Sequence, residues 1–253
     1  MRDTYARRGA LAGTLLEVIA SSAEDALAAW EGGAHRIEVV SCLEEDGLSP
    51  PRGLVETLLE TVSLPLRVMV RPANVFTVTD PAERSAVVQD AAQWAGLPID
   101  GIVTGYVTPE GAIDEDLLGE AAEASGHRVT FHRAIERVTS GDPVAALRAQ
   151  PRVDRILSGG GAGAWSERRT RLETLQCAAS PIIVVTGGGV DGEAVDVLTA
   201  SRSLRELHVG RTVRQRGRVE GAVTADAVRT LLARIARAGS VRQRPDPSAP
   251  RSR

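Results

Sequence analysis

The stretch 128-RVTFHRAIE-136 is a short buried-strand pattern that ends abruptly in charged side chains. Val129 and Phe131 suit a pleated, packed surface, yet His132 and Arg133 follow without a break. Side chains alternate across a strand, so His132 shares the face of Thr130, whereas Arg133 lies just past the pleat. A strand that carries an imidazole to its own end predicts a functional site there if similar strands lie beside it.

The rest of the chain repeats this unit, because short β-branched or apolar runs alternate with helical patterns. The predicted strands are 15–19, 36–40, 66–71, 100–105, 128–133, 154–159, 182–187 and 205–210. The predicted helices are 22–33, 52–62, 81–95, 114–125, 142–150, 166–179, 191–201 and 224–239. Eight strands, each followed by a helix, predict a (β/α)8 TIM barrel that forms a single domain over residues 13–239.

The main structural rival is a doubly wound open sheet, which usually has fewer strands and a glycine-rich nucleotide loop after the first strand. Residues 19–22, which follow the first strand, read IASS and contain no glycine. Outside the barrel we expect a flexible N-terminus over residues 1–12 and a disordered, arginine- and proline-rich tail over residues 240–253.

The charge balance excludes several classes of partner. A formal net charge of −3 argues against nucleic acid and against a membrane surface. The sequence contains no apolar run long enough to span a membrane and no signal peptide, so we expect a cytoplasmic location.

The chain contains no lysine, since all 30 basic residues are arginine. Schiff-base chemistry is therefore excluded, because no side-chain amine can form the imine. Dinucleotide redox chemistry is not indicated, because the nucleotide-binding loop is absent. The two cysteines, Cys42 and Cys177, are too few for a disulfide framework or a multi-thiolate metal cage.

Polar and charged residues occur at or near the end of nearly every predicted strand, where TIM barrels place their active sites. Alternation predicts that five of them point into the barrel: Glu17, Glu38, Arg71, His132 and His208. Burying such a ring is costly without a function. Two glutamates on neighbouring strands, joined by two histidines, suit general acid–base catalysis or a divalent metal ion. We expect Arg71 either to neutralise the glutamates or to bind an anionic ligand.

A second set of residues is expected to bind substrate or an anion. Loops after the seventh and eighth strands of such barrels often bind phosphate through backbone N–H groups. Besides Arg71, the candidates are Arg133, Thr104, Ser158, Thr186, Gly187, Gly188, Gly189, Gly210 and Arg211. The alternative for Arg133 is an ion pair with Glu136, and the alternative for the glycines is a purely structural role in tight turns.

Several of these segments occur in the order found in one known family. They are LLEV, HRIEVV, DGLSP, VMVRP, DGIVTG, VTFHRA, RILSGG, PIIVVTGGGV and ELHVG, spread over residues 15–211. In these motifs the chain resembles the CutC copper homeostasis family. The resemblance implies a TIM barrel, a cytoplasmic location and a homodimer, and it implies copper only through the family name.

The chain departs from the family pattern at the cysteines that follow its first two strands. Those positions read Ile19-Ala20 and Val40 here, and Cys42 lies two residues further on. Copper(I) favours soft sulfur ligands. Cys42, together with Met69, is therefore a weak copper candidate, and the cofactor stays open between copper, a divalent metal ion and none.

We therefore expect a small-molecule enzyme with lyase, isomerase or hydrolase chemistry. In this hypothesis Glu17, Glu38, His132 and His208 are catalytic, and the ligand is polar or anionic, sugar-like or phosphorylated. The same four residues are the metal ligands if a metal is bound. The alternatives are a copper-binding protein without catalysis and a divalent-metal sugar isomerase or epimerase.

Overall fold

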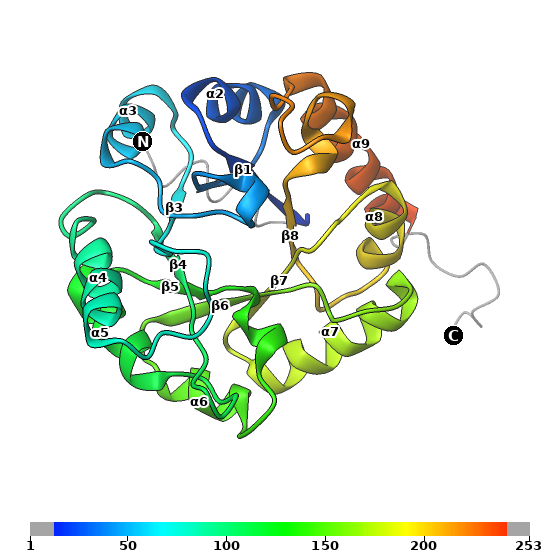
Figure 1. The fold of residues 1–253 in the computed structure, drawn as a ribbon. Coiled ribbons are helices and arrows are strands. Elements are labelled where there is room, and N and C mark those ends of the chain that lie inside the picture. The colour runs from blue at the N-terminus through cyan, green and yellow to red at the C-terminus, as the bar shows by residue number, and fades with distance from the viewer. Residues whose placement is uncertain (1–12, 242–253) are drawn as a thin grey trace, which may run out of the picture.

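The computed structural model describes residues 13–241, with side chains to residue 238, as a closed parallel barrel. Figure 1 shows the strands at the centre and the helices around them. The strands are β1 Leu15–Ala20, β2 Arg36–Val39, β3 Leu66–Met69, β4 Gly101–Thr104, β5 Val129–Phe131, β6 Val153–Ser158, β7 Ile183–Thr186 and β8 Glu206–Val209. Each pairs with its sequence neighbours, and β1 pairs with β8, so the barrel closes. The predicted TIM barrel is confirmed.

The helices of the outer ring follow the strands in order. They are α2 Ala23–Gly32, α3 Arg52–Thr61, α4 Pro81–Ala92, α5 Glu115–Ser125, α6 Pro143–Ala149, α7 Trp165–Ala179, α8 Gly192–Thr199 and α9 Ala225–Val241. Side chains cap several of them: Ser22 accepts a hydrogen bond from the Asp25 N–H, and Asp80 accepts from Ala82 and Glu83. Four short 3-10 turns, which the sequence patterns did not predict, lie in the connections: η1 Leu43–Glu45, η2 Arg133–Arg137, η3 Arg211–Val213 and η4 Gln215–Gly217.

The expected N-terminal tail, residues 1–12, and residues 242–253 of the expected C-terminal tail, 240–253, lie outside the described residues. Helix α9 ends at Val241, two residues beyond the predicted end of the barrel domain. Within the described residues no helix is long and apolar enough to cross a membrane.

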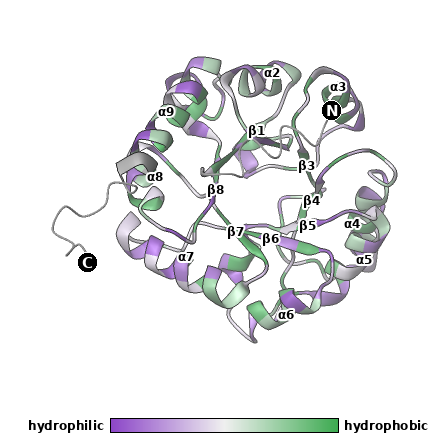
Figure 2. Ribbon diagram, turned by 180° about the vertical axis from the view of Figure 1, so that it is seen from behind, coloured by the Kyte–Doolittle hydropathy of each residue, from purple (hydrophilic) through white to green (hydrophobic). Residues whose placement is uncertain are grey.

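The packed core lies between the barrel and its helices. Leu16 and Val18 of β1 are fully buried in this layer, as their alternation predicted. Figure 2 shows that the helices carry both hydrophilic and hydrophobic segments, as expected for amphipathic helices that pack on a barrel. The opposite face of each strand points into the barrel, where charged side chains replace much of the apolar filling.

The lower half of the barrel, toward the amino ends of the strands, contains a chain of ion pairs. Arg36 contacts Glu206, and Glu206 accepts from Arg155 at 2.9 Å. Arg155 also contacts Asp154, which binds Arg67 at 2.8 and 2.9 Å. The side chains of Arg36 and Arg67 are essentially buried. A buried charge is unfavourable without its partner, so these ion pairs hold the side chains below the cavity in fixed positions.

Candidate functional site

A cavity of about 770 Å³ opens at the carboxyl ends of the strands. Its floor includes Glu38, Met69, His132 and His208, and its walls come from the loops that follow β2, β3, β5, β7 and β8. The predicted residues that line it are Glu38, Arg71, His132, Arg133, Gly188, Gly189, His208, Gly210 and Arg211. The mouth of the barrel is therefore where predicted site residues from distant parts of the sequence converge.

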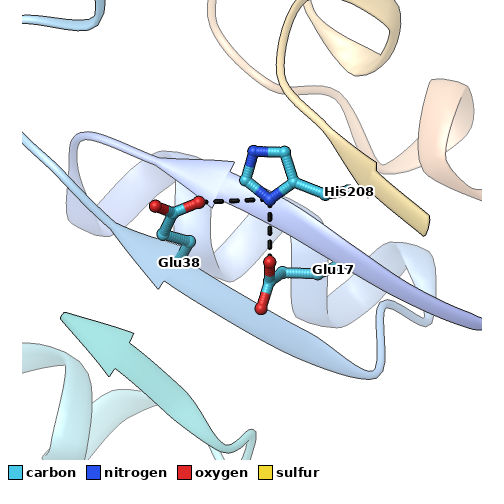
Figure 3. A group of neighbouring side chains, drawn as sticks. All are labelled: Glu17, Glu38 and His208. Carbon is cyan, nitrogen blue, oxygen red and sulfur yellow. Dashed lines mark hydrogen bonds and ion pairs between the residues drawn. The ribbon is translucent and has the colours of Figure 1, made fainter. Parts of the chain in front are cut away.

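Glu17, Glu38 and His208 form a buried cluster at the floor of this cavity, and Figure 3 shows the His208 ring between the two carboxyl groups. The strand register brings them together, since Glu17 lies opposite His208 across β1 and β8, and Glu38 lies opposite Ile19 across β1 and β2. Nδ1 of His208 is 2.7 Å from Oε1 of Glu17 and 3.1 Å from Oε2 of Glu38. The other ring nitrogen of His208 lies on the side away from the carboxylates (Figure 3). Glu17 is not part of the cavity lining and lies beneath it.

The two glutamates have opposite protonation tendencies. Burial opposes ionisation of Glu17, but the charge of Arg36 and the hydrogen bond with His208 outweigh it and hold the pKa of Glu17 far below its usual value. Burial raises the pKa of Glu38 to about 7, because His208 compensates only in part and Glu17 adds repulsion. Burial also disfavours the charged form of His208, but the two carboxylates reverse this effect and raise its pKa. Of the two carboxyls, Glu38 is the one that lines the cavity and the one whose protonated form is favoured.

The cation that neutralises Glu17 is Arg36, not Arg71. The Arg36 guanidinium donates through Nε to Glu17 and through NH2 to Glu206, and all three side chains are buried. The sequence interpretation missed Arg36 and Glu206. The same alternation that selected Glu38 and His208 would have found them, since each lies two residues earlier on the same strand face.

His132 lies on the opposite side of the barrel and is separate from this cluster. Its Nδ1 accepts a hydrogen bond from the Ala134 backbone N–H at 3.2 Å, and its ring packs edge-on against Phe76 and Phe131. Burial, together with the charge of Arg71, lowers the pKa of His132 to about 3. A histidine with this pKa is neutral at physiological pH and does not carry protons as an imidazolium.

Arg71 connects two loops of the cavity wall. Its NH1 group donates to the carbonyls of Glu45 and Gly47 at 3.0 and 3.1 Å, and its NH2 group contacts Asn74. The guanidinium also stacks over the Phe76 ring, 4.4 Å from its centre. Most of its donors are engaged within the protein, so the structure gives Arg71 a role in shaping the wall.

The rim of the cavity carries further charge. Arg133 forms the ion pair that was the alternative to ligand binding, with NH2 2.8 Å from Oε2 of Glu136. The Arg211 guanidinium has no hydrogen-bond or ion-pair partner among the described residues. The N-terminus of α8, where a phosphate was expected, is capped by Asp191, whose carboxylate accepts from the Ala194 N–H at 2.9 Å. A resident carboxylate competes with phosphate for these donors.

Four predicted ligand-binding residues do not line the cavity, because alternation turns three of their side chains away from the interior. Thr104 donates to the Val70 carbonyl at 2.9 Å, Ser158 accepts from the Gly160 N–H at 3.1 Å, and Thr186 is buried. Gly187 does face inward, but a Cβ there would lie 2.7 Å from Leu157 and 3.1 Å from His208. Its lack of a side chain leaves room for the His208 ring.

Neither cysteine joins the site. Cys42 and Cys177 are exposed, and neither is among the residues of the cavity. Cys42 lies at the start of η1, whose next residue, Leu43, does line the cavity. Met69 is at the cavity floor and is buried. Within the described residues, the cluster with metal-ligand spacing is Glu17, Glu38 and His208, which contains no sulfur.

The fold and the site together define a single-domain TIM-barrel protein with a buried cluster of two glutamates and one histidine at the carboxyl ends of its strands. The chain belongs to the CutC family, whose model matches residues 14–213. It is 36% identical to a CutC family protein of Xanthomonas campestris over 197 residues, which cover 76% of this chain and 81% of that protein. It is 32% identical to the human copper homeostasis protein cutC homolog over 216 residues, or 83% and 78% of the two chains.

Solved structures agree with this fold. The crystal structure of a putative copper homeostasis protein CutC from Streptococcus agalactiae matches with a TM-score of 0.69 at 22% identity, covering 78% of this chain and 98% of that one. Phosphoribosyl anthranilate isomerase from Thermococcus kodakaraensis matches with a TM-score of 0.54 at 17% identity, covering 88% and 98%. At these identities the likeness concerns the barrel alone.

Proposed function

We propose that this chain is a small-molecule enzyme in which Glu38 is the general acid and base. The observation that carries the proposal is the position of Glu38, a buried carboxyl that lines the cavity and has a pKa raised to about 7. General acid–base catalysis is most effective when the pKa of the catalytic group lies near the working pH. A carboxyl that served only packing would be better replaced by an uncharged side chain.

The other members of the cluster support Glu38 in distinct ways. Glu17 stays ionised through Arg36 and accepts the Nδ1 proton of His208 at 2.7 Å. This hydrogen bond orients the imidazole and leaves its Nε2 directed away from the carboxylates (Figure 3). In this role His208 adjusts the proton affinity of Glu38 and donates a hydrogen bond to the ligand.

Metabolite profiling tests the proposal, because a mixture of compounds can be screened for conversion before the substrate is identified. The wild-type protein and Glu38→Gln are incubated separately with a bacterial small-molecule extract, and the extracts are compared by mass spectrometry and NMR. We expect the wild type to convert at least one compound. Glu38→Gln should convert that compound at least about 100-fold more slowly than the wild type. The matched control is Glu56→Gln, since Glu56 lies on the exposed face of α3 and pairs with Arg52 at 2.8 Å. Equal conversion by Glu38→Gln and the wild type would refute the proposal.

A second candidate function follows from the ligand spacing of Glu17, Glu38 and His208, whose donor atoms lie within 4.8 Å of one another. Two carboxylates and an imidazole suit a divalent ion such as Zn²⁺ or Mn²⁺. The charge of Arg36 against Glu17 opposes a cation there, so we place the proton-exchanging cluster first. Metal analysis of protein purified without chelator separates the two: about one equivalent of a divalent metal, lost in Glu17→Gln, would favour the metal site.

Copper(I) does not fit the donors of this cluster. Copper is suggested by the name of the human relative, but copper(I) favours soft sulfur ligands, and this cluster contains none. Cys42 and Cys177 are exposed and lie outside the cluster. We therefore assign no copper-dependent step to this chain.

A further inference from the structure

Five buried side-chain polar atoms of the described residues have no hydrogen-bond partner, and one of them belongs to a residue that lines the cavity. That atom is Nε2 of His132; the others are on Trp94, Thr186, Arg169 and Arg214. Leaving a buried donor unpaired is energetically costly. His132 has just 4% of its surface exposed, so bulk water does not offset this cost. An unpaired polar atom on a buried residue of the cavity lining points to a ligand.

The surroundings of His132 determine which ring nitrogen carries the proton. The backbone N–H of Ala134 donates to Nδ1 over 3.2 Å. A backbone N–H cannot accept, so Nδ1 presents its lone pair and the ring proton is on Nε2. The unpaired Nε2 atom is therefore a hydrogen-bond donor, and its partner must be an acceptor such as an oxygen.

The ring is also held in place and kept neutral. Phe76 and Phe131 pack edge-on against it, with ring centroids 5.4 and 6.3 Å away. A Cβ on Gly105 would lie 2.9 Å from Nδ1, so glycine at this position gives the ring its space. Burial and the nearby positive charges of Arg71 and Arg133 disfavour the imidazolium form. His132 is thus a fixed, neutral donor.

The barrel places this donor across the mouth from the acid–base cluster. Glu38 and His208 are on β2 and β8, the two neighbours of β1, whereas His132 follows β5, four strands from β1 in either direction. A small ligand in the cavity can therefore contact the His132 donor at one end and the Glu38 carboxyl at the other.

Resting on the proposed function of Glu38, we infer that the substrate is a carbonyl compound, whose carbonyl oxygen accepts from Nε2–H of His132 and whose adjacent C–H faces Glu38. A neutral donor polarises a carbonyl as negative charge develops on its oxygen. The chain has no lysine, so the carbonyl cannot be activated as an imine. A hydrogen-bonded carbonyl is the form of activation that these residues provide.

The corresponding step is an enolisation. The Glu38 carboxylate removes the proton from the carbon next to the carbonyl. The C–H electron pair forms a C=C bond, and the C=O π pair moves to oxygen, which His132 stabilises through its N–H. Glu38 then returns the proton to the same carbon. In an α-hydroxy carbonyl compound, the hydroxyl proton can first move to the former carbonyl oxygen, and Glu38 then protonates the former carbonyl carbon while the hydroxyl oxygen becomes the new carbonyl. The product is an isomer or epimer, and no oxidant, reductant or co-reactant is needed.

Exchange of carbon-bound hydrogen in D2O tests this inference. The probes are dihydroxyacetone, D-ribulose, D-fructose and their monophosphates, followed by NMR. For at least one probe we expect the wild type to exchange the C–H next to the carbonyl at least 10-fold faster than buffer. His132→Leu should lower that rate about 100-fold. His132→Gln should stay within 10-fold of the wild type, because the glutamine side-chain N–H replaces the Nε2–H. Thermal unfolding checks that both variants fold.

A second measurement is independent of any ligand. The ¹⁵N shifts of histidine-labelled protein at pH 7 distinguish the neutral Nε2–H form from the Nδ1–H form and from imidazolium, and His132→Gln assigns the signal. We expect the neutral Nε2–H form. Imidazolium or the Nδ1–H form would overturn the inference, as would wild-type exchange by His132→Leu.

The two proposals fail in different ways. If no probe is exchanged although metabolite profiling finds a Glu38-dependent conversion, the carbonyl assignment is wrong and the role of Glu38 stands. If profiling finds no Glu38-dependent conversion either, the proposed function itself is wrong.

Discussion

Nδ1 of His208 lies 2.7 Å from Oε1 of Glu17, and both side chains are buried at the floor of the barrel mouth. The Arg36 guanidinium contacts the other oxygen of this carboxylate from below. The result is a line of alternating charge that runs from the ion-pair layer to the cavity. Because Glu17 already pairs with Arg36 and His208, Glu38 is the carboxyl to which the proposed function assigns proton exchange with a ligand.

Removing the cation of this line should be strongly destabilising. Arg36→Met leaves the buried carboxylates of Glu17 and Glu206 without their shared partner. We expect a loss of about 3–5 kcal/mol in the free energy of unfolding, measured by urea denaturation at pH 7. Arg52→Met is the matched control, because Arg52 forms an exposed pair with Glu56 and should change stability by about 0.5 kcal/mol or less. Similar losses for the two variants would show that the ion pairs of Arg36 make no net contribution to the free energy of unfolding.

The stability of the protein should depend on the protonation of Glu38. Its pKa is raised from 4.5 to about 7 on folding, so the folded state binds this proton more tightly than the unfolded chain. The corresponding stability is fully present below pH 4.5 and is lost as the pH rises through 7. Glutamine cannot ionise, so Glu38→Gln does not lose this stability as the pH rises. The difference in free energy of unfolding between Glu38→Gln and the wild type should therefore be about 1–3 kcal/mol more favourable to the variant at pH 8 than at pH 5. Urea denaturation at the two pH values measures the difference, and an equal effect at both would contradict the raised pKa.

The space around His132 should not tolerate a methyl group. In Gly105→Ala the new Cβ would lie 2.9 Å from His132 Nδ1 and 3.0 Å from the Phe131 ring. We expect a loss of about 1–3 kcal/mol in thermal or urea unfolding and a shifted His132 NMR signal. In Gly53→Ala the Cβ meets nothing within 4 Å, and alanine suits helix α3, so stability should rise by up to about 1 kcal/mol. An unchanged His132 signal in Gly105→Ala would mean that the ring has room to move.

The sequence predicted the barrel because strand alternation and turn chemistry are local properties. The strand that ends in His132 shows how far alternation reaches: it correctly places His132 inward, and it sets Glu17, Glu38 and His208 on the interior face. Alternation does not show which side chains pair with one another inside the barrel. Of the two roles expected for Arg71, the structure does not show the neutralisation of Glu17, since Arg36 supplies that charge and the Arg71 donors bind loop carbonyls.

Residues near the strand ends were harder to place. Thr104, Ser158 and Thr186 are one residue out of phase with the interior face, so being near the end of a strand was not enough to bring them to the cavity. The roles within the site depend on distances between strands far apart in the sequence. The neutral state of His132 likewise follows from its surroundings in three dimensions.

The proposed role of Glu38 requires this buried carboxyl to exchange a proton near neutral pH. A ¹³C NMR titration of protein labelled at the glutamate carboxyl carbons measures this, with Glu38→Gln used to assign the signal. We predict one carboxyl that titrates near pH 7 and whose signal is missing from Glu38→Gln. If the Glu38 carboxyl instead titrates near its ordinary value of 4.5, Glu38 is a simple carboxylate at neutral pH and the account is contradicted.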